Sequence, residues 1–271
     1  MSKTSLPEVE KFFHYISPII LTLVAKKYKK SRIVKHKGND PTNINFATEA
    51  DLETEKLIVD EIHKRFPEDL IIAEENFSEV RINDNNRFWI IDPICGTSNF
   101  AREINLFVSN IALAENGKLI ASCVVDHSQN EYIWSTGQYK IFTNKKEAKI
   151  GKKAPGIVVD VDLTALKNSS RETKEKYSKF VSRLVTGTSY AVVTHATSLG
   201  FAYTALGKID AYICAEINLW DIAAANFLVL QTGGIISELS GSPWTLRSLN
   251  VVAAKDKNLH KQLINFINTR N

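Results

Sequence analysis

Residues 88–100 of the chain read FWIIDPICGTSNF, and this stretch decides which fold can be expected. Residues 88–91 form a continuous apolar run of the kind that predicts a buried strand. The run ends directly in a carboxylate, Asp92, and a turn of small residues follows at positions 96–98. Hydroxyl groups and free backbone N–H groups in such a turn can surround an anion. A carboxylate for a metal beside amides for a phosphate indicates metal-assisted phosphoryl chemistry.

The composition indicates a globular protein with a substantial core, because 44% of the 271 residues are hydrophobic. The net charge of +4 comes from 34 basic and 30 acidic residues, which is too even a balance to indicate a nucleic-acid partner. The densest basic run, residues 26–30, is interpreted as the solvated end of a helix rather than a nucleic-acid or lipid patch.

Cysteine usage and the N-terminal segment both favour a cytoplasmic protein. The three cysteines, Cys95, Cys123 and Cys214, show no CxxC spacing, so neither a disulfide framework nor a zinc site is expected. The apolar stretch 16–25 is too short to span a bilayer and contains Pro18, so we expect neither an export signal nor a membrane partner.

The order of apolar periodicities predicts stacked layers rather than one doubly wound sheet. Pro18 is expected to bend or split the first helix, and Asn116-Gly117 to close a hairpin. Polar residues 35–46 are interpreted as a loop that can fold over a site. Helices are predicted over residues 7–30, 50–66, 172–185, 198–206, 221–231 and 260–267. Strands are predicted over residues 70–73, 88–91, 106–114, 119–126, 132–135, 138–143, 157–161, 209–214 and 235–238.

The lysine-rich stretch 144–155 is the most plausible internal boundary. It predicts one compact unit with two subdomains. Residues 1–145 would form an α+β part with helices, an antiparallel sheet and most metal ligands. Residues 146–271 would form an α/β part that supplies Asp221.

Four separated segments contain acidic residues in an order and spacing that are specific: TEAD at 48–51, AEE at 73–75, DPICGTSNF at 92–100 and WDIAAA at 220–225. Together they resemble the inositol monophosphatase family, the metal-dependent and lithium-sensitive type of phosphatase. The resemblance covers roughly residues 48–225 and implies an αβαβα sandwich and a homodimer.

Each acid also has an ordinary structural explanation. Thr48-x-x-Asp51 is a capping box, Glu74 is compatible with a strand-end surface acid, and Asp92 with a turn before proline. Asp221 opens a predicted helix, where it suits the helix dipole. The combination of all four favours the functional interpretation.

The resemblance implies a role for each position. Asp51 and Thr97 would orient and activate the attacking water, and Glu74 would be the third catalytic residue. Glu75 would be a weaker outer-shell candidate at the first metal. The site would hold about two or three Mg²⁺ ions, which prefer hard oxygen ligands, with Mn²⁺ as a possible substitute. The first metal would be held by Glu74, Asp92 and the carbonyl of Ile94, the second by Asp92 and Asp221, and the phosphate by Gly96, Thr97 and Ser98.

The chain departs from the family signature at Cys95, which stands where the signature has its second aspartate. In the family that acid binds the second metal and contacts substrate hydroxyls, whereas a thiol is a soft and poor ligand for Mg²⁺. Three outcomes stay open: a higher Mg²⁺ demand, a preference for a softer ion such as Mn²⁺ or Zn²⁺, or loss of turnover. Thiol-nucleophile chemistry is not favoured, because the turn lacks an arginine-rich phosphate loop.

Substrate recognition is also altered. Cys214 stands where inositol-hydrolysing members tend to carry a glutamate, and Thr197 replaces a common arginine, while Ser198 and Gly200 are retained. With fewer polar groups for an inositol ring, Cys95, Ser198, Gly200 and Cys214 are the candidate substrate contacts.

Two functions of different classes follow. The first is a Mg²⁺-dependent phosphatase that hydrolyses a small phosphate monoester, an inositol phosphate or a related sugar or nucleotide phosphate, with metal-activated water. The second is a catalytically weak or inactive family member that binds a phosphorylated ligand or a protein partner. A nicotinamide oxidoreductase is rejected because no GxGxxG motif follows a first strand.

Overall fold

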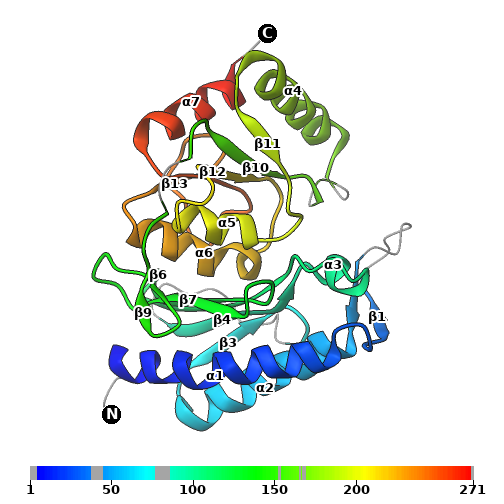
Figure 1. Ribbon diagram of the computed structural model, residues 1–271, viewed down its shortest axis with the longest axis vertical. Helices are drawn as coiled ribbons and strands as arrows, with labels where there is room; N and C mark the ends of the chain where they lie inside the picture. Colours follow the sequence, from blue (N-terminus) through cyan, green and yellow to red (C-terminus); the bar gives the residue numbers. More distant parts are fainter. Residues whose placement is uncertain are drawn as a thin grey trace.

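The computed structural model describes residues 5–37, 45–76, 86–151, 154–164, 166 and 169–269. Its helices are α1 (Leu6–Lys27), α2 (Glu49–Arg65), α3 (Thr97–Ala101), α4 (Arg171–Gly187), α5 (Leu199–Ala205), α6 (Leu219–Gln231) and α7 (Lys257–Asn268). Figure 1 shows five layers: α1 and α2, a first sheet, α5 and α6, a second sheet, and finally α4 and α7. This is the predicted αβαβα sandwich.

The larger sheet has seven strands in sequential order and forms the base of the site. β3 pairs with β4 in parallel, and the remaining pairs are antiparallel. The register between β4 and β5 runs regularly to Asp92↔Asn110 and then shifts before Cys95↔Val108. The strands are β3 (Leu70–Ala73), β4 (Arg87–Cys95), β5 (Val108–Glu115), β6 (Lys118–Asp126), β7 (Glu131–Ser135), β8 (Phe142–Thr143) and β9 (Lys146–Glu147).

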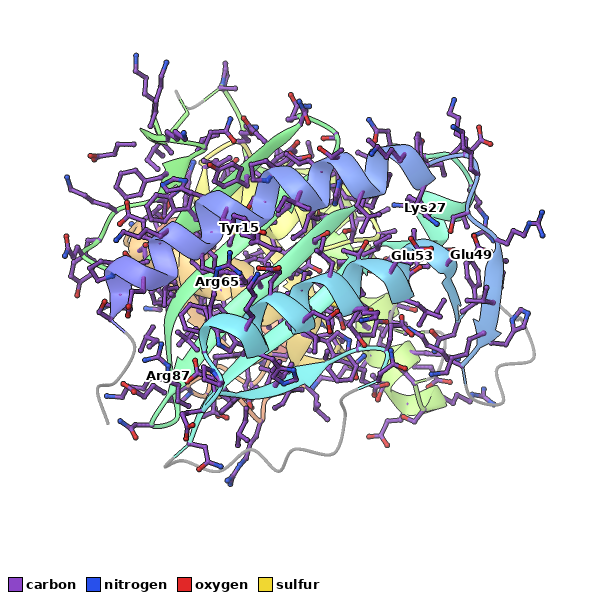
Figure 2. The ribbon with its side chains drawn as sticks, turned by 90° about the horizontal axis from the view of Figure 1, so that it is seen from below. Tyr15, Lys27, Glu49, Glu53, Arg65 and Arg87 are labelled. Atoms are coloured by element: carbon purple, nitrogen blue, oxygen red, sulfur yellow. The ribbon has the colours of Figure 1, made fainter. Side chains whose placement is uncertain are left out.

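The outer helices α1 and α2 lie side by side across one face of this sheet (Figure 2). Their buried aromatic rings, Phe12 and Phe66, pack on Trp89 of β4 at centroid distances of 5.3 and 5.1 Å. The expected break at Pro18 is absent: α1 is one continuous helix. Pro18 lies on the exposed side of α1, whereas the opposite side is buried in the core. Packing of that buried side keeps the helical turns before and after Pro18 in one continuous helix.

The second sheet has the order β11-β10-β12-β14-β13 and mixes parallel and antiparallel pairs. Helix α6 lies between the two sheets, and its Ala223, Ala224 and Ala225 are at most 1% exposed. These small side chains let the helix approach the larger sheet closely. The strands are β10 (Val158–Asp162), β11 (Ala191–Val193), β12 (Ala211–Cys214), β13 (Ile235–Ser237) and β14 (Val251–Ala254).

Local turn chemistry explains where some strands end. Asn116 and Gly117 both have positive φ, 52° and 73°, so the predicted hairpin between β5 and β6 is confirmed. The predicted strand over 138–143 is wrong for its first half, because Gln138 and Tyr139 adopt positive φ of 64° and 57° and only β8 remains. A small hairpin pairs β1 (Ile33–His36) with β2 (Phe46–Thr48).

The first sheet ends with β9 and the second begins with β10. The division into subdomains 1–145 and 146–271 stays a prediction. Residues of α5 and α6 form one hydrophobic core together with residues of both sheets. In the part of the chain that the structure describes, no helix has the length and apolar character required to cross a bilayer.

Candidate active site

A cleft of about 880 Å³ opens where β4, α3, α5 and α6 meet. Its walls come from four chain segments that are remote in sequence: residues 95–99 with Arg102, residues 162–164, residues 196–198, and residues 216–218 with Asp221. Asn45 and Phe46 at the start of β2 and Glu74 just after β3 complete the lining.

The floor of the cleft is the turn that follows β4. Gly96 has φ +99°, and a Cβ there would lie 3.2 Å from both the Leu106 carbonyl oxygen and the Thr197 Cβ, so only glycine fits without strain. The Thr197 hydroxyl donates to the Cys95 carbonyl at 2.8 Å, and the Asn99 amide donates to the carbonyl of His195 at 2.9 Å. The turn is thereby fixed to the second half of the chain.

Asp51 closes the expected capping box and also contacts Thr97. Its Oδ2 accepts hydrogen bonds from the backbone N–H and the hydroxyl of Thr48, at 2.8 and 2.6 Å, as a capping box requires. Its Oδ1 accepts a hydrogen bond from the Thr97 hydroxyl at 2.9 Å. Burial raises the pKa of Asp51 to about 6, although these hydrogen bonds favour the charged form.

Asp92 is the most unusual group of the site. The residue is fully buried, and neither carboxylate oxygen has a hydrogen-bond partner among the described residues. Burial raises the pKa of Asp92 well above its ordinary value, and Cys95, Glu74 and Asp221 raise it further. A buried carboxylate without a donor is costly unless a cation or proton accompanies it, so its surroundings fit a metal ligand.

Asp221 lies at the third position of α6 and closes a capping box with Asn218, whose backbone N–H donates to Oδ2 at 3.1 Å. Its other oxygen, Oδ1, is 3.9 Å from the Cys95 sulfur. Burial and the nearby Glu74 raise the pKa of Asp221 to about 7. Asp92, Cys95 and Asp221 each offer one ligand atom within 4.8 Å of the other two, so the structure brings these predicted positions together.

Glu74 lines the same cleft, but its carboxylate is paired with Lys37, a residue that no motif of the sequence singled out. Lys37 Nζ donates to Glu74 Oε1 at 2.8 Å and to Glu75 Oε1 at 2.5 Å. Burial, with the charge of Glu74 as the next cause, raises the pKa of Glu75 to about 7. Lys37 lies in the segment 35–46 that was predicted to be a loop. Residues 38–44 of that segment lie outside the described part of the chain.

The other predicted positions differ in how they relate to the cleft. The Ile94 carbonyl oxygen lies 3.0 Å from the Thr97 hydroxyl and shares the single proton of that hydroxyl with Asp51. Ser98 lines the cleft, and the Arg102 guanidinium donates to its carbonyl at 3.2 Å. Ser198 lines it too, and its hydroxyl accepts a hydrogen bond from the Asn110 amide at 2.9 Å.

Gly200 and Cys214 are buried and are not brought into the lining. A Cβ on Gly200 would overlap the carboxylate of Asp160, which binds His195 Nδ1 at 2.8 Å. In this structure, therefore, the missing side chain of Gly200 makes room for an aspartate–histidine pair.

Comparisons with known proteins agree with this fold. The family model described as "Inositol monophosphatase family" matches residues 6–270, so the chain belongs to the inositol monophosphatase family.

Among curated proteins, the chain is 30% identical over 224 residues to a fructose-1,6-bisphosphatase/inositol-1-monophosphatase of Thermotoga maritima, covering 83% of each chain. It is 28% identical over 245 residues to the Nus factor SuhB of Escherichia coli (strain K12), covering 90% of each.

Among solved structures, an IMPase of Thermotoga maritima superposes with a TM-score of 0.81 at 26% identity, covering 96% of this chain and 97% of that one. An IMPase/NADP phosphatase complexed with Mg²⁺ and phosphate has the same fold, with a TM-score of 0.81 at 17% identity and coverage of 99% and 98%. The relatives similar to this chain therefore include both a phosphatase and a protein named as a Nus factor.

Proposed function

We propose that the protein is a metal-dependent phosphatase that hydrolyses a small phosphate monoester. The observation that carries the proposal is Asp92, a fully buried carboxylate whose two oxygens have no partner among the described residues and which lies beside Cys95 and Asp221. Such a group supports cation binding better than it supports a structural role, because an unpaired buried carboxylate destabilises the fold.

The donor set fits divalent cations. In the proposal, Glu74, Asp92 and the Ile94 carbonyl hold the first position, and Asp92 with Asp221 belongs to the second. When bound, the cations supply Lewis acidity that activates water and neutralises charge on the phosphate. Mg²⁺ suits the oxygen ligands of the first position, with Mn²⁺ as its closest substitute.

Lys37 occupies part of this oxygen set in the structure. Its ammonium group contacts Glu74 and Glu75 at once, so it offsets the charge of the two carboxylates when no divalent cation is present. A cation at the first position must compete with Lys37 for Glu74, while the contact with Glu75 can persist.

The residues Asp51 and Thr97 are suited to proton handling. With a pKa of about 6, Asp51 is mainly ionised at pH 7 and accepts the Thr97 hydroxyl proton in a hydrogen bond. The Thr97 oxygen then has lone pairs free to accept a hydrogen bond from water, which orients that water toward a phosphate. Amides of Gly96, Thr97 and Ser98 at the turn are the proposed donors to the phosphate oxygens.

The experiment is phosphate release from a panel of monoesters: inositol 1-phosphate, fructose 1,6-bisphosphate, NADP and an aryl phosphate, each with Mg²⁺, with Mn²⁺, with Zn²⁺ and with Mg²⁺ and Zn²⁺ together. We expect metal-dependent turnover of at least one ester by the native chain and none by Asp92→Asn. Absence of turnover with every ester and every cation would reject the proposal and favour the alternative below.

The alternative is a weak or inactive relative that binds a phosphorylated ligand or a protein. Two observations favour it: Cys95 replaces a metal-binding acid, and a relative of 28% identity bears the name Nus factor rather than that of an enzyme. Restoration of turnover by Cys95→Asp in an otherwise silent chain would support this alternative.

The proposal also includes a cytoplasmic homodimer with a small phosphorylated metabolite as its ligand. All three cysteines are free and buried, as in proteins of a reducing compartment. Light scattering of the purified chain tests the dimer.

A further inference from the structure

The side of the cleft formed by Cys95 and Asp221 has a ligand set different from that of Glu74. Cys95 Sγ, one oxygen of Asp92 and one oxygen of Asp221 lie within 4.8 Å of one another. Cys95 is 6% exposed and Asp92 is 0% exposed, so bulk water competes little for these atoms. Neither oxygen of Asp92 has a hydrogen-bond partner among the described residues, so a cation can bind them without displacing a donor.

The sulfur of Cys95 accepts a backbone hydrogen bond. The N–H of Ser198 donates to Cys95 Sγ at 3.3 Å, a contact that favours the thiolate. Burial and the neighbouring Asp221 outweigh it and raise the pKa of Cys95 to about 12, so the metal-free site holds a thiol. The backbone of Cys95 is held from the same segment, because the Thr197 hydroxyl donates to its carbonyl at 2.8 Å. Outer hydrogen bonds of this kind fix the position of a metal-ligating atom and tune its affinity.

We propose that Cys95 Sγ, Asp92 and Asp221 form a mixed sulfur–oxygen site for a thiophilic divalent cation of the Zn²⁺ class, in place of the Mg²⁺ expected from an all-oxygen set. This inference deepens the proposed function, since it names the cation of the second position. A thiolate ligand favours Zn²⁺ or Co²⁺ over Mg²⁺, which takes oxygen ligands. Three protein ligands with a fourth position open are typical of catalytic zinc.

The observed geometry is compatible with such a cation. Bonds of about 2.3 Å to sulfur and about 2.0–2.2 Å to oxygen, at a tetrahedral angle, place the two ligand atoms roughly 3.5–3.7 Å apart. The Cys95 Sγ to Asp221 Oδ1 distance is 3.9 Å, so for this pair of ligand atoms a side-chain adjustment of a few tenths of an ångström suffices. As the metal–sulfur bond forms, the thiol proton leaves to solvent or buffer, and no oxidant or reductant is needed.

The test is a titration of the metal-free full chain with Co²⁺, followed by absorption spectroscopy. A cobalt–thiolate bond gives a near-ultraviolet charge-transfer band that oxygen ligands do not give. We expect the band in the native chain at one equivalent, loss of the band when Zn²⁺ is added, and no loss with a hundredfold excess of Mg²⁺. Cys95→Ser and Cys95→Asp remove the band, and Zn²⁺ affinity falls by about 100-fold or more in Cys95→Ser, since loss of an outer-shell partner alone costs about 10–100-fold.

The matched control is Cys123→Ala, which removes another buried cysteine that lies in β6, in the core facing α1. This variant keeps the band. Absence of a band in the native chain, or its persistence in a folded Cys95→Asp chain, overturns the inference. A band without phosphate release leaves the inference standing and rejects the proposed function, whereas Mg²⁺-driven release without a band does the reverse.

Discussion

On one side of the cleft, Asp51, Thr97 and Glu74 form an all-oxygen array; on the other, the sulfur of Cys95 lies beside Asp92 and Asp221. The first side has a capped helix, a threonine hydroxyl and a lysine that together satisfy most oxygens. The second has an Asp92 carboxylate without a hydrogen-bond partner among the described residues and a sulfur that accepts one N–H group. Under the proposed function, one signature stretch keeps its proton-handling half while its metal-binding half changes ligand chemistry.

The largest expected effect comes from Asp92, which belongs to both proposed cation positions. Asp92→Asn removes the charge that both cation positions need, so phosphate release should fall by about 10³-fold or more. Because Asn resembles the protonated carboxyl, the metal-free chain should keep its thermal stability. Phosphate release and thermal unfolding in chelator measure the two effects. Turnover within tenfold of the native rate would contradict the shared role.

The next largest effect is expected for Thr97, which belongs to the all-oxygen side of the cleft. Thr97→Ala removes the hydroxyl between Ile94 and Asp51 and should lower kcat by about 10²–10³-fold with little change in KM. Thr97→Ser keeps the hydroxyl and is the matched control, with a loss of less than about tenfold. Equal losses in the two variants would show that the methyl group, rather than the hydroxyl, is what matters.

A smaller effect, on the Mg²⁺ demand, is expected when the sulfur ligand is replaced. Cys95→Asp restores an all-oxygen set and should lower the Mg²⁺ concentration for half-maximal activity by roughly 10–100-fold. Mg²⁺ titrations of phosphate release by the native and variant chains measure it. The idea fails if the Mg²⁺ demand of the variant matches or exceeds that of the native chain.

The smallest effect is on stability and pH. Below about pH 3, Asp51 and Asp221 are mostly protonated in both the folded and unfolded chains. As the pH rises, the unfolded chain ionises first, whereas the folded-state pKa values are raised to about 6 and about 7. The free energy of unfolding of the metal-free chain should therefore fall between pH 4 and 7, by about 2 kcal/mol for Asp51 and about 3 kcal/mol for Asp221.

Urea unfolding in chelator at pH 5 and pH 7.5 checks this expectation. Asp51→Asn removes one titrating group and should flatten the dependence, and Mg²⁺ should stabilise the chain more at pH 7.5 than at pH 5. A native chain that gains stability from pH 5 to pH 7.5 in chelator would contradict the assigned causes.

Much of the fold could be predicted because its signals are local. The apolar run before Asp92, the capping box at Thr48 and the Asn116-Gly117 turn each act within a few residues, and each lies where it was expected. The failure at Pro18 has the opposite cause: long-range burial of α1 outweighs a local helix breaker. Strands such as β14 and β11 were missed because their short apolar runs become strands only beside β12 and β10.

By itself, the sequence determined the family, the layered fold and the positions of the acids, because four motifs in a fixed order leave few alternatives. The tertiary structure decided which atoms meet. Cys95 and Asp221 are 126 residues apart, and only the packing of α6 against the first sheet places the sulfur 3.9 Å from the carboxylate. Likewise, the contact of Lys37 with Glu74 and Glu75 and the place of Asp160 over Gly200 depend on long-range packing, which no local pattern records.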